Sequence, residues 1–330
     1  MNRYVFLLLL VCGTGQASLL FEEDSVLDIT LQGPLTAVTK DVSQRRDLPF
    51  SLHIDGVVVD VGVRVRGNSR IEHCRFKPLR LNFSSGSADG TVFVGQDKVK
   101  LVTHCRKTAD YEKNVLEEYA AYRIMNLLSD VSYRTRLVRI RYVDTDDPKD
   151  AKVRYGFLIE PDEALAARLG GELVNVRNVV RGMFDTQHSS LVFVFQYVIG
   201  NTDWSHVRFI DDETCCHNGR LLRIGERQYY IPYDFDLSGL VNARYAKPQP
   251  ELRINSVKVR RYRGYCTDAD VLRNALHAVV LRRNHILGVV SGLPYLSEKH
   301  IESRIAYLDK FFERAQKEDK LLREFERRCL

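Results

Sequence analysis

The sequence has little of what marks the specialised protein classes. Its 330 residues include one Trp and nine Pro, and 28% of them are charged, which excludes collagen-like, coiled-coil and mostly disordered chains. There is no internal repeat, and after residue 17 no window approaches the eighteen apolar residues that suit a membrane-spanning helix. The chain is therefore expected to fold as one large domain or two lobes and, once processed, to be soluble.

The excess of one sign of charge over the other is also small. Lys and Arg number 49 and Asp and Glu number 43, so the net charge is only +6. The excess is scattered along the chain, and a solvated basic surface explains it better than a nucleic-acid partner does. We expect no nucleic acid among the ligands.

The first seventeen residues have the pattern of a secretory signal. Arg3 gives a positive start, Tyr4–Cys12 is apolar, and small residues precede a cleavage point after Ala17. A lipoprotein signal that uses the cysteine of this run fits less well, because Val11 stands where a small residue is needed. The protein is therefore predicted to be secreted or periplasmic.

Cysteine usage agrees with export. Six cysteines follow the predicted leader: Cys74, Cys105, Cys215, Cys216, Cys266 and Cys329. An even number in an oxidising compartment indicates disulfides. Cys74 and Cys105 flank a strand-rich segment and are expected to pair. The adjacent Cys215 and Cys216 are expected to pair outward, with Cys266 and Cys329. No C-x-x-C spacing supports the alternative of a zinc site.

Hydrophobic periodicity predicts a β-rich first part, residues 18–160, that contains one long helix. Residues 57–66 are rich in β-branched side chains, and residues 79–83 and 98–102 alternate apolar with polar, as half-buried strands do. Helical spacing follows from Asp110 to Leu128, and then two more strand-like runs, residues 137–143 and 153–160.

The second part, residues 161–330, is predicted to be mainly helical. Ser190–Ile199 is almost wholly apolar and indicates a buried helix. Thr267 with Asp270 forms a capping box for a helix that runs to Val290, and residues 297–328 suggest one long charged helix. Strands followed by helices predict an α+β protein with two lobes.

A polar turn follows the buried helix. Gly200 ends the helix, and Asn201, Asp203 and the only Trp, Trp204, come directly after it. Turns of this kind can hold polar side chains rigidly at the edge of a cleft. The alternative is that Asn201 and Asp203 only cap the helix and the next turn.

Two aspartates follow an apolar strand, in the segment Ile231–Gly239. Asp234 and Asp236 are two residues apart, so in an extended chain both carboxylates point to the same side. Paired carboxylates together with phosphate oxygens are the usual ligands of magnesium. An acidic turn in solvent is the alternative, but the apolar flanks argue against free exposure.

A basic segment with a glycine lies in the first part. Gly67 stands between Arg66 and Arg70, and Lys77 and Arg80 follow. A glycine here lets backbone amides approach an anion, and the cations could bind phosphates. A basic hairpin without a ligand is the alternative.

These segments follow one another in the order found in protein-kinase-like phosphotransferases. The chain resembles the spore-coat-protein-H (CotH) kinases over about residues 60–242. The matching segments are Arg66-Gly67-Asn68-Ser69 with the strand from Lys77 to Phe83, Asn114-Val115-Leu116, Gly156–Glu160, Gly200–Trp204 and Asp234-Phe235-Asp236. The resemblance implies a two-lobed, atypical kinase-like fold that binds ATP with Mg²⁺.

The resemblance also implies roles for single residues. Asp203 matches the catalytic aspartate, which accepts the hydroxyl proton or orients the nucleophile, and Asp234 matches the main metal ligand, with Asp236 assisting. The nucleotide would be contacted by Arg66, Lys77, Arg80, Glu118 and Glu160. Lys77 or Arg80 would bind phosphates and pair with Glu117 or Glu118, and the segment around Glu160 would lie against adenine.

One departure concerns a second metal ion. Kinase-like sites offer an Asn a few residues after the catalytic Asp, whereas Asp203 is followed by Trp204-Ser205-His206-Val207. His206 or Asn218 could substitute, or the second metal is absent.

Two functions remain open. One is an exported kinase that transfers phosphate from ATP to a protein hydroxyl. The other is a catalytically inactive relative with a binding or structural role. A metal-dependent hydrolase lacks support, because the sequence offers no His-rich ligand set.

Overall fold

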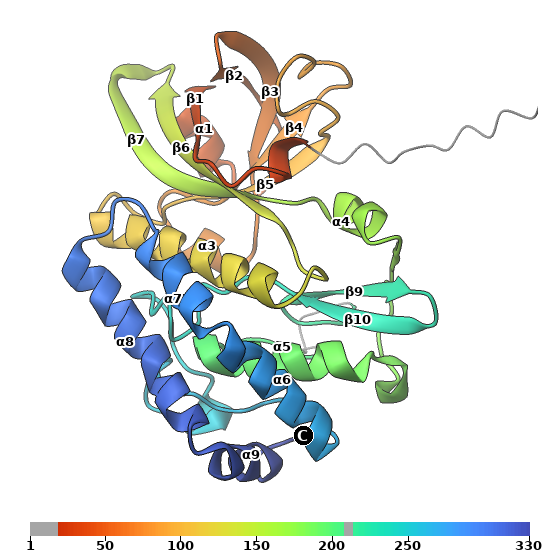
Figure 1. Cartoon of the computed structure of the whole chain (residues 1–330). Coiled ribbons are helices and arrows are strands. Elements are labelled where there is room, and N and C mark those ends of the chain that lie inside the picture. The colour runs from red at the N-terminus through yellow and green to blue at the C-terminus, as the bar shows by residue number, and fades with distance from the viewer. Residues whose placement is uncertain (1–18, 208–213) are drawn as a thin grey trace, which may run out of the picture.

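The computed structural model describes residues 19–207 and 214–330 (Figure 1). A β-barrel forms the amino-terminal part, and helices dominate the carboxyl-terminal part, so the expected α+β class is confirmed. The predicted leader, with its cleavage after Ala17, lies outside the described residues. Within the described ranges, no helix combines the length and apolar character that crossing a bilayer requires.

Seven strands close the barrel in the order β1-β2-β3-β4-β5-β7-β6. They are β1 (Leu27–Gly33), β2 (Leu48–Ile54), β3 (Val57–Val65), β4 (Leu79–Phe83), β5 (Lys98–Val102), β6 (Thr135–Asp144) and β7 (Asp147–Ile159). β1 pairs with β6 in parallel, and the other neighbours are antiparallel. Leu79, Leu81 and Phe83 point into the barrel core while Arg80 and Asn82 point away, so the alternation predicted for this strand is confirmed.

The helix α3 (Ala109–Leu128) lies between the barrel and the other helices (Figure 1). Its buried side chains, Leu116 and Ile124 among them, belong to the larger hydrophobic core, which also contains α5 (Thr186–Ile199). The barrel interior forms a second, separate core. By packing, α3 therefore belongs with the helical part, although in sequence it lies between barrel strands.

A small sheet lies beside the helices, in the order β10-β9-β8. Its strands are β8 (Glu172–Leu173), β9 (Gly219–Ile224) and β10 (Arg227–Pro232). The remaining helices are α1 (Leu35–Lys40), α2 (Ser69–His73), α4 (Asp162–Arg168), α6 (Ala269–Leu281), α7 (Arg283–Ser291), α8 (Glu298–Ala315) and α9 (Glu318–Glu326). Short 3-10 turns occur at Leu19–Phe21, Arg181–Met183 and Pro250–Leu252.

Two helix predictions were wrong in their extent. The helix expected to end at Val290 is divided into α6 and α7 at Arg282, and its cap is Asp268, whose carboxylate accepts hydrogen bonds from the N–H groups of Asp270 and Val271. The long charged helix is divided into α8 and α9. The break lets both halves bury their apolar faces, with Phe311 of α8 and Phe325 of α9 fully buried.

The disulfides confirm one expected pair and correct the others. Cys74 pairs with Cys105 as predicted, with their Cα atoms 4.5 Å apart. Cys215 and Cys216 pair with each other, and Cys266 pairs with Cys329, so the expected outward pairing was wrong. The physical reason lies at the carboxyl end, where the Leu330 N–H donates to the Gly264 carbonyl and brings Cys329 to Cys266. Three disulfides indicate a protein that folds in an oxidising compartment.

Candidate functional site

The turn after α5 is held rigidly. Gly200 ends the helix in a left-handed conformation, φ 66°, and the hydroxyl of Tyr307 fills the space where a larger residue would place its Cβ atom. Asn201 then accepts a hydrogen bond from the Asp203 N–H at 3.0 Å, and its carbonyl accepts one from the Trp204 indole at 3.1 Å. Asp203 is thereby fixed on a backbone that has little freedom.

Three side chains hold the Asp203 carboxylate. One oxygen, Oδ1, lies 3.1 Å from the His217 Nε2 and accepts a hydrogen bond from Gln249 at 3.0 Å. The other, Oδ2, accepts one from Asn218 at 2.8 Å. Burial alone would raise the pKa of Asp203, but these hydrogen bonds outweigh it and the pKa lies below its ordinary value. Asp203 is therefore ionised and oriented at neutral pH.

Asp234 follows the end of β10 in a left-handed conformation, φ 62°. Its N–H donates to the hydroxyl of Tyr122 on α3 at 3.0 Å. Positive φ is uncommon outside glycine and is found at functional sites and tight turns. Asn218 links Asp203 to this position. Its side chain donates a hydrogen bond to Asp203, and its carbonyl accepts one from the N–H of Tyr233. The two aspartates thus share one region.

A buried arginine holds the second carboxylate of this region. Arg70 donates from Nε to Asp236 at 2.9 Å and from Nη2 to Glu118 at 2.5 Å, and Nη2 lies 3.5 Å from Asp234. Asp236 also accepts a hydrogen bond from the Tyr245 hydroxyl. We call Glu118, Asp234 and Asp236 the carboxylate cluster.

The charges in the carboxylate cluster influence one another. Burial and the nearby carboxylates raise the pKa values of Glu118 and Asp234, while the attraction of Arg70 opposes the rise. The Asp203 charge contributes to the effect on Asp234. For Arg70, the carboxylates outweigh burial, and its pKa lies well above the ordinary value. Arg70 is therefore a permanent cation inside an acidic site.

A cavity of about 40 Å³ lies between the barrel and α3. Its lining residues are Arg66, Lys100, Glu118, Tyr122, Tyr133, Ile159, Tyr233 and Asp234. The Lys100 Nζ lies 2.9 Å from the Asp162 Oδ1 and near the rings of Tyr133 and Tyr233. Arg66 makes no ion pair with any described residue, and its Nε is buried without a hydrogen-bond partner. The cavity therefore offers one paired and one unpaired cation to an anionic ligand.

Some residues with predicted nucleotide contacts lie elsewhere or have other partners. Lys77 donates a hydrogen bond to the Cys74 carbonyl. Arg80 on β4 pairs with Lys100 on the neighbouring strand β5, but its guanidinium lies near Asp47. Neither Lys77 nor Arg80 lines the cavity. The cation that pairs with Glu118 is Arg70, so the expected pairing with Lys77 or Arg80 was wrong. The lysine that lines the cavity is Lys100 on β5.

The two other glutamates of the prediction have structural partners. Glu117 lies on α3 beside Glu118 but contacts His300 and Arg304 of α8. Glu160 is 3% exposed, and its carboxylate binds the guanidinium of Arg168 and the N–H of Arg134. Its side chain is therefore occupied within the protein, whereas the preceding residue, Ile159, does line the cavity.

Sequence reasoning missed Arg70, Lys100, His217 and Gln249 as parts of this site. The available signals were weak: Arg70 belongs to the basic segment around Gly67, and Lys100 alternates within a predicted strand. His217 and Gln249 lie 14 and 46 positions after Asp203 and come close to it only through the fold.

The donors fit a magnesium ion shared with phosphates. Across residues 19–207 and 214–330, no group of three or more His, Cys, Asp or Glu side chains could hold a metal ion alone. Asp234 and Asp236 offer two carboxylates, which suffices for Mg²⁺ when phosphate oxygens and water complete its shell. Neither suggested substitute for the missing Asn fits: Asn218 binds Asp203, and His206 is 3% exposed and stacks on Tyr230.

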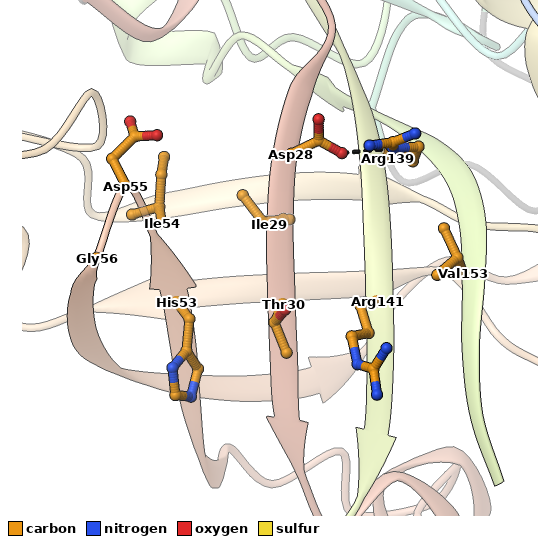
Figure 2. A pocket seen from close by; sticks show the side chains of 10 residues that line it. All are labelled: Asp28, Ile29, Thr30, His53, Ile54, Asp55, Gly56, Arg139, Arg141 and Val153. Carbon is orange, nitrogen blue, oxygen red and sulfur yellow. Dashed lines mark hydrogen bonds and ion pairs between the residues drawn. The ribbon is translucent and has the colours of Figure 1, made fainter.

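A larger hollow lies away from this region. Figure 2 shows it on the outer face of the barrel, about 600 Å³ in volume, where Thr30 of β1 lies between His53 of β2 and Arg141 of β6. Asp28 and Arg139 form an ion pair at its edge. None of the predicted site residues lines this hollow, and the chemistry gathered around Asp203 and Asp234 makes the smaller cavity the stronger candidate.

Comparisons with known proteins add a distant structural match. No family model matches the chain, and no curated protein matches it. Among solved structures, the chain is similar to the Helicobacter pylori proinflammatory kinase CtkA, with a TM-score of 0.40 and 16% sequence identity over 71% of this chain and 89% of that chain. The resemblance to the CotH kinases therefore stays a prediction.

Proposed function

We propose that this protein is an exported, kinase-like phosphotransferase that transfers phosphate from ATP to a protein hydroxyl. The observation that carries the proposal is that Asp234 lines one cavity together with two cations, Arg66 and Lys100. Arg70 joins Asp236 to Asp234, and the charge of Asp203 acts on Asp234 from outside the cavity. Phosphoryl transfer needs this combination, because catalysis rests on positioning and on neutralising phosphate charge.

Each group has a defined task in this proposal. Arg66, the cation without an ion pair, binds phosphate oxygens, and Lys100 adds positive charge beside it. Asp234 and Asp236 hold Mg²⁺, which would neutralise charge on the phosphates. Asp203 is ionised and oriented by His217, Asn218 and Gln249, so it can accept the proton of the attacking hydroxyl.

The cavity sets a condition on nucleotide binding. Its volume of about 40 Å³ is far below the roughly 300–1,000 Å³ of ordinary ligand pockets. A nucleotide can therefore enter only if the barrel moves away from the helical part or if the side chains that line the cavity move. This condition favours the second candidate function, a binding or structural protein that retains the kinase-like site without catalysis.

Nucleotide binding by the exported form, measured by calorimetry with and without Mg²⁺, tests the proposal. The wild type should bind ATP more tightly with Mg²⁺, and Asp234→Ala should lose this gain because the replacement has no ligand for the metal. Asp28→Ala is the matched control, since Asp28 is an exposed carboxylate ion-paired to Arg139 on the outer face of the barrel.

The outcomes separate the two candidates. Transfer of labelled γ-phosphate to a protein acceptor supports the kinase. Nucleotide binding without transfer supports the non-catalytic role. If the wild type binds no nucleotide at either Mg²⁺ concentration, the kinase proposal is wrong.

A further inference from the structure

The feature that carries a further inference is the place of Arg70 among the residues proposed to bind the metal. Its side chain is 9% exposed, and its guanidinium contacts all three members of the carboxylate cluster. A buried arginine with three acidic partners is unusual, because charged side chains are seldom buried and cost free energy unless they are paired. One arginine therefore performs the neutralisation that a bound cation would otherwise supply.

The hydrogen bonds show which carboxylate oxygens remain available. Arg70 and Tyr245 both donate to Oδ2 of Asp236, and Oδ1 has no hydrogen-bond partner among the described residues. The contact of Asp234 with Arg70 is made by Oδ1, at 3.5 Å from Nη2. One metal ion can therefore bind the available oxygens of Asp234 and Asp236, but a second ion would have to compete with Arg70 for Asp236 Oδ2.

The local charge leads to the same conclusion. At most, with all three carboxylates ionised, the cluster has a charge of −3, which Arg70 reduces to −2 without any metal. One divalent ion is then sufficient to neutralise it. A second divalent ion would have to bind beside a guanidinium that cannot lose its proton, and like charges repel strongly in a buried site.

We propose that Arg70 takes the place of a second divalent cation and limits the site to one metal ion per bound nucleotide. This inference rests on the proposed function and refines it: the substrate is a nucleotide that carries one metal ion. It also accounts for the departure in the sequence. A site that uses Arg70 needs no Asn after Asp203 as a second metal ligand, and Asn218 holds Asp203 instead.

Mn²⁺ binding to the exported form tests the proposal, because the electron paramagnetic resonance signal of free Mn²⁺ counts the ions bound. Titrations are run with and without a non-hydrolysable ATP analogue. We expect one Mn²⁺ per wild-type chain at saturating analogue, and the same for Arg70→Lys, which keeps the charge. Arg70→Gln removes the charge and should bind a second Mn²⁺. Arg64→Gln is the matched control on the same barrel, since Arg64 lies 3.9 Å from Asp47 and lines no part of the cavity.

Two wild-type Mn²⁺ ions per bound analogue would overturn the proposal without reference to any variant, and so the test does not depend on the folding of Arg70→Gln. A folded Arg70→Gln protein that binds no additional Mn²⁺ would also overturn it. Failure of the proposed function gives a different result, namely no analogue bound by any variant. In that case the titration without analogue still decides the role of Arg70: additional Mn²⁺ in Arg70→Gln supports it, and an unchanged count refutes it.

Discussion

Removal of each disulfide in turn should affect stability very unequally. The sequence separation is 31 residues for Cys74–Cys105, 63 for Cys266–Cys329 and 1 for Cys215–Cys216. In the chain-entropy description, a disulfide stabilises a protein by restricting the unfolded chain, and the effect grows with the logarithm of the loop length. The first two bonds then contribute about 3.7 and 4.3 kcal/mol at 25 °C. The bond between adjacent cysteines closes no chain loop and contributes nothing through this effect.

Paired Cys→Ala variants of the oxidised protein test this ranking. Urea unfolding can be followed by the fluorescence of the single tryptophan, Trp204, which is 2% exposed in the larger core. Far-UV circular dichroism monitors the whole fold, and coincident curves would justify a two-state free energy. The variant without Cys215–Cys216 should lose less than ~2 kcal/mol, mainly from lost packing of the buried sulfur atoms. A loss as large as that of the Cys266–Cys329 variant would refute the reasoning from loop entropy.

Three further predictions concern single side chains. Asp203→Ala should keep nucleotide affinity within about twofold but lose phosphoryl transfer, since Asp203 does not line the cavity; a comparable loss of binding would contradict its assigned role. Glu117→Ala should lower the free energy of unfolding by about 3 kcal/mol, because it leaves Arg304 without its carboxylate, and urea titration measures this; an unchanged midpoint would refute it. Burial lowers the pKa of His206 to about 3, so below pH 6.5 the unfolded chain takes up its proton first and stability falls on acidification. The His206→Phe variant should therefore lose less unfolding free energy on acidification than the wild type, by up to about 1.4 kcal/mol per pH unit between pH 6.5 and pH 3. Parallel plots of unfolding free energy against pH for the two proteins would disprove the lowered pKa of His206.

The fold was predictable from the sequence where the signal is local. Alternating apolar residues predicted the barrel strands at Leu79–Phe83 and Lys98–Val102, and an apolar run predicted α5. The helix breaks near Arg282 and Lys317 were missed, because neither is marked by Gly or Pro at the break. These breaks arise from packing, since a straight helix could not bury its second half in the same core.

The site divides in the same way. The aspartate motifs were visible because Asp203 and Asp234 each follow a buried apolar element directly. Arg70 was not singled out as buried, because its burial depends on α3 and on the turn after β10, which are distant in the sequence. Lys77 was preferred over Lys100 because Lys77 belongs to the basic segment. In the fold, Lys77 donates to the Cys74 carbonyl and Lys100 lines the cavity.

Two adjacent glutamates on α3 face different neighbours, and this determines how the protein could open. Glu117 is bound by His300 and Arg304 of α8, and Asn114 one turn earlier donates to the Val241 carbonyl. Glu118 is bound by Arg70, which comes from the barrel side. When the barrel moves to admit a nucleotide, α3 should therefore remain with α8 as one rigid body, and the Arg70–Glu118 contact should be the one that lengthens. The pivot of such a motion would then lie at the ends of α3 and not between α3 and α8, so that entry of a nucleotide and release of the acidic residues from their internal cation would be one mechanical event.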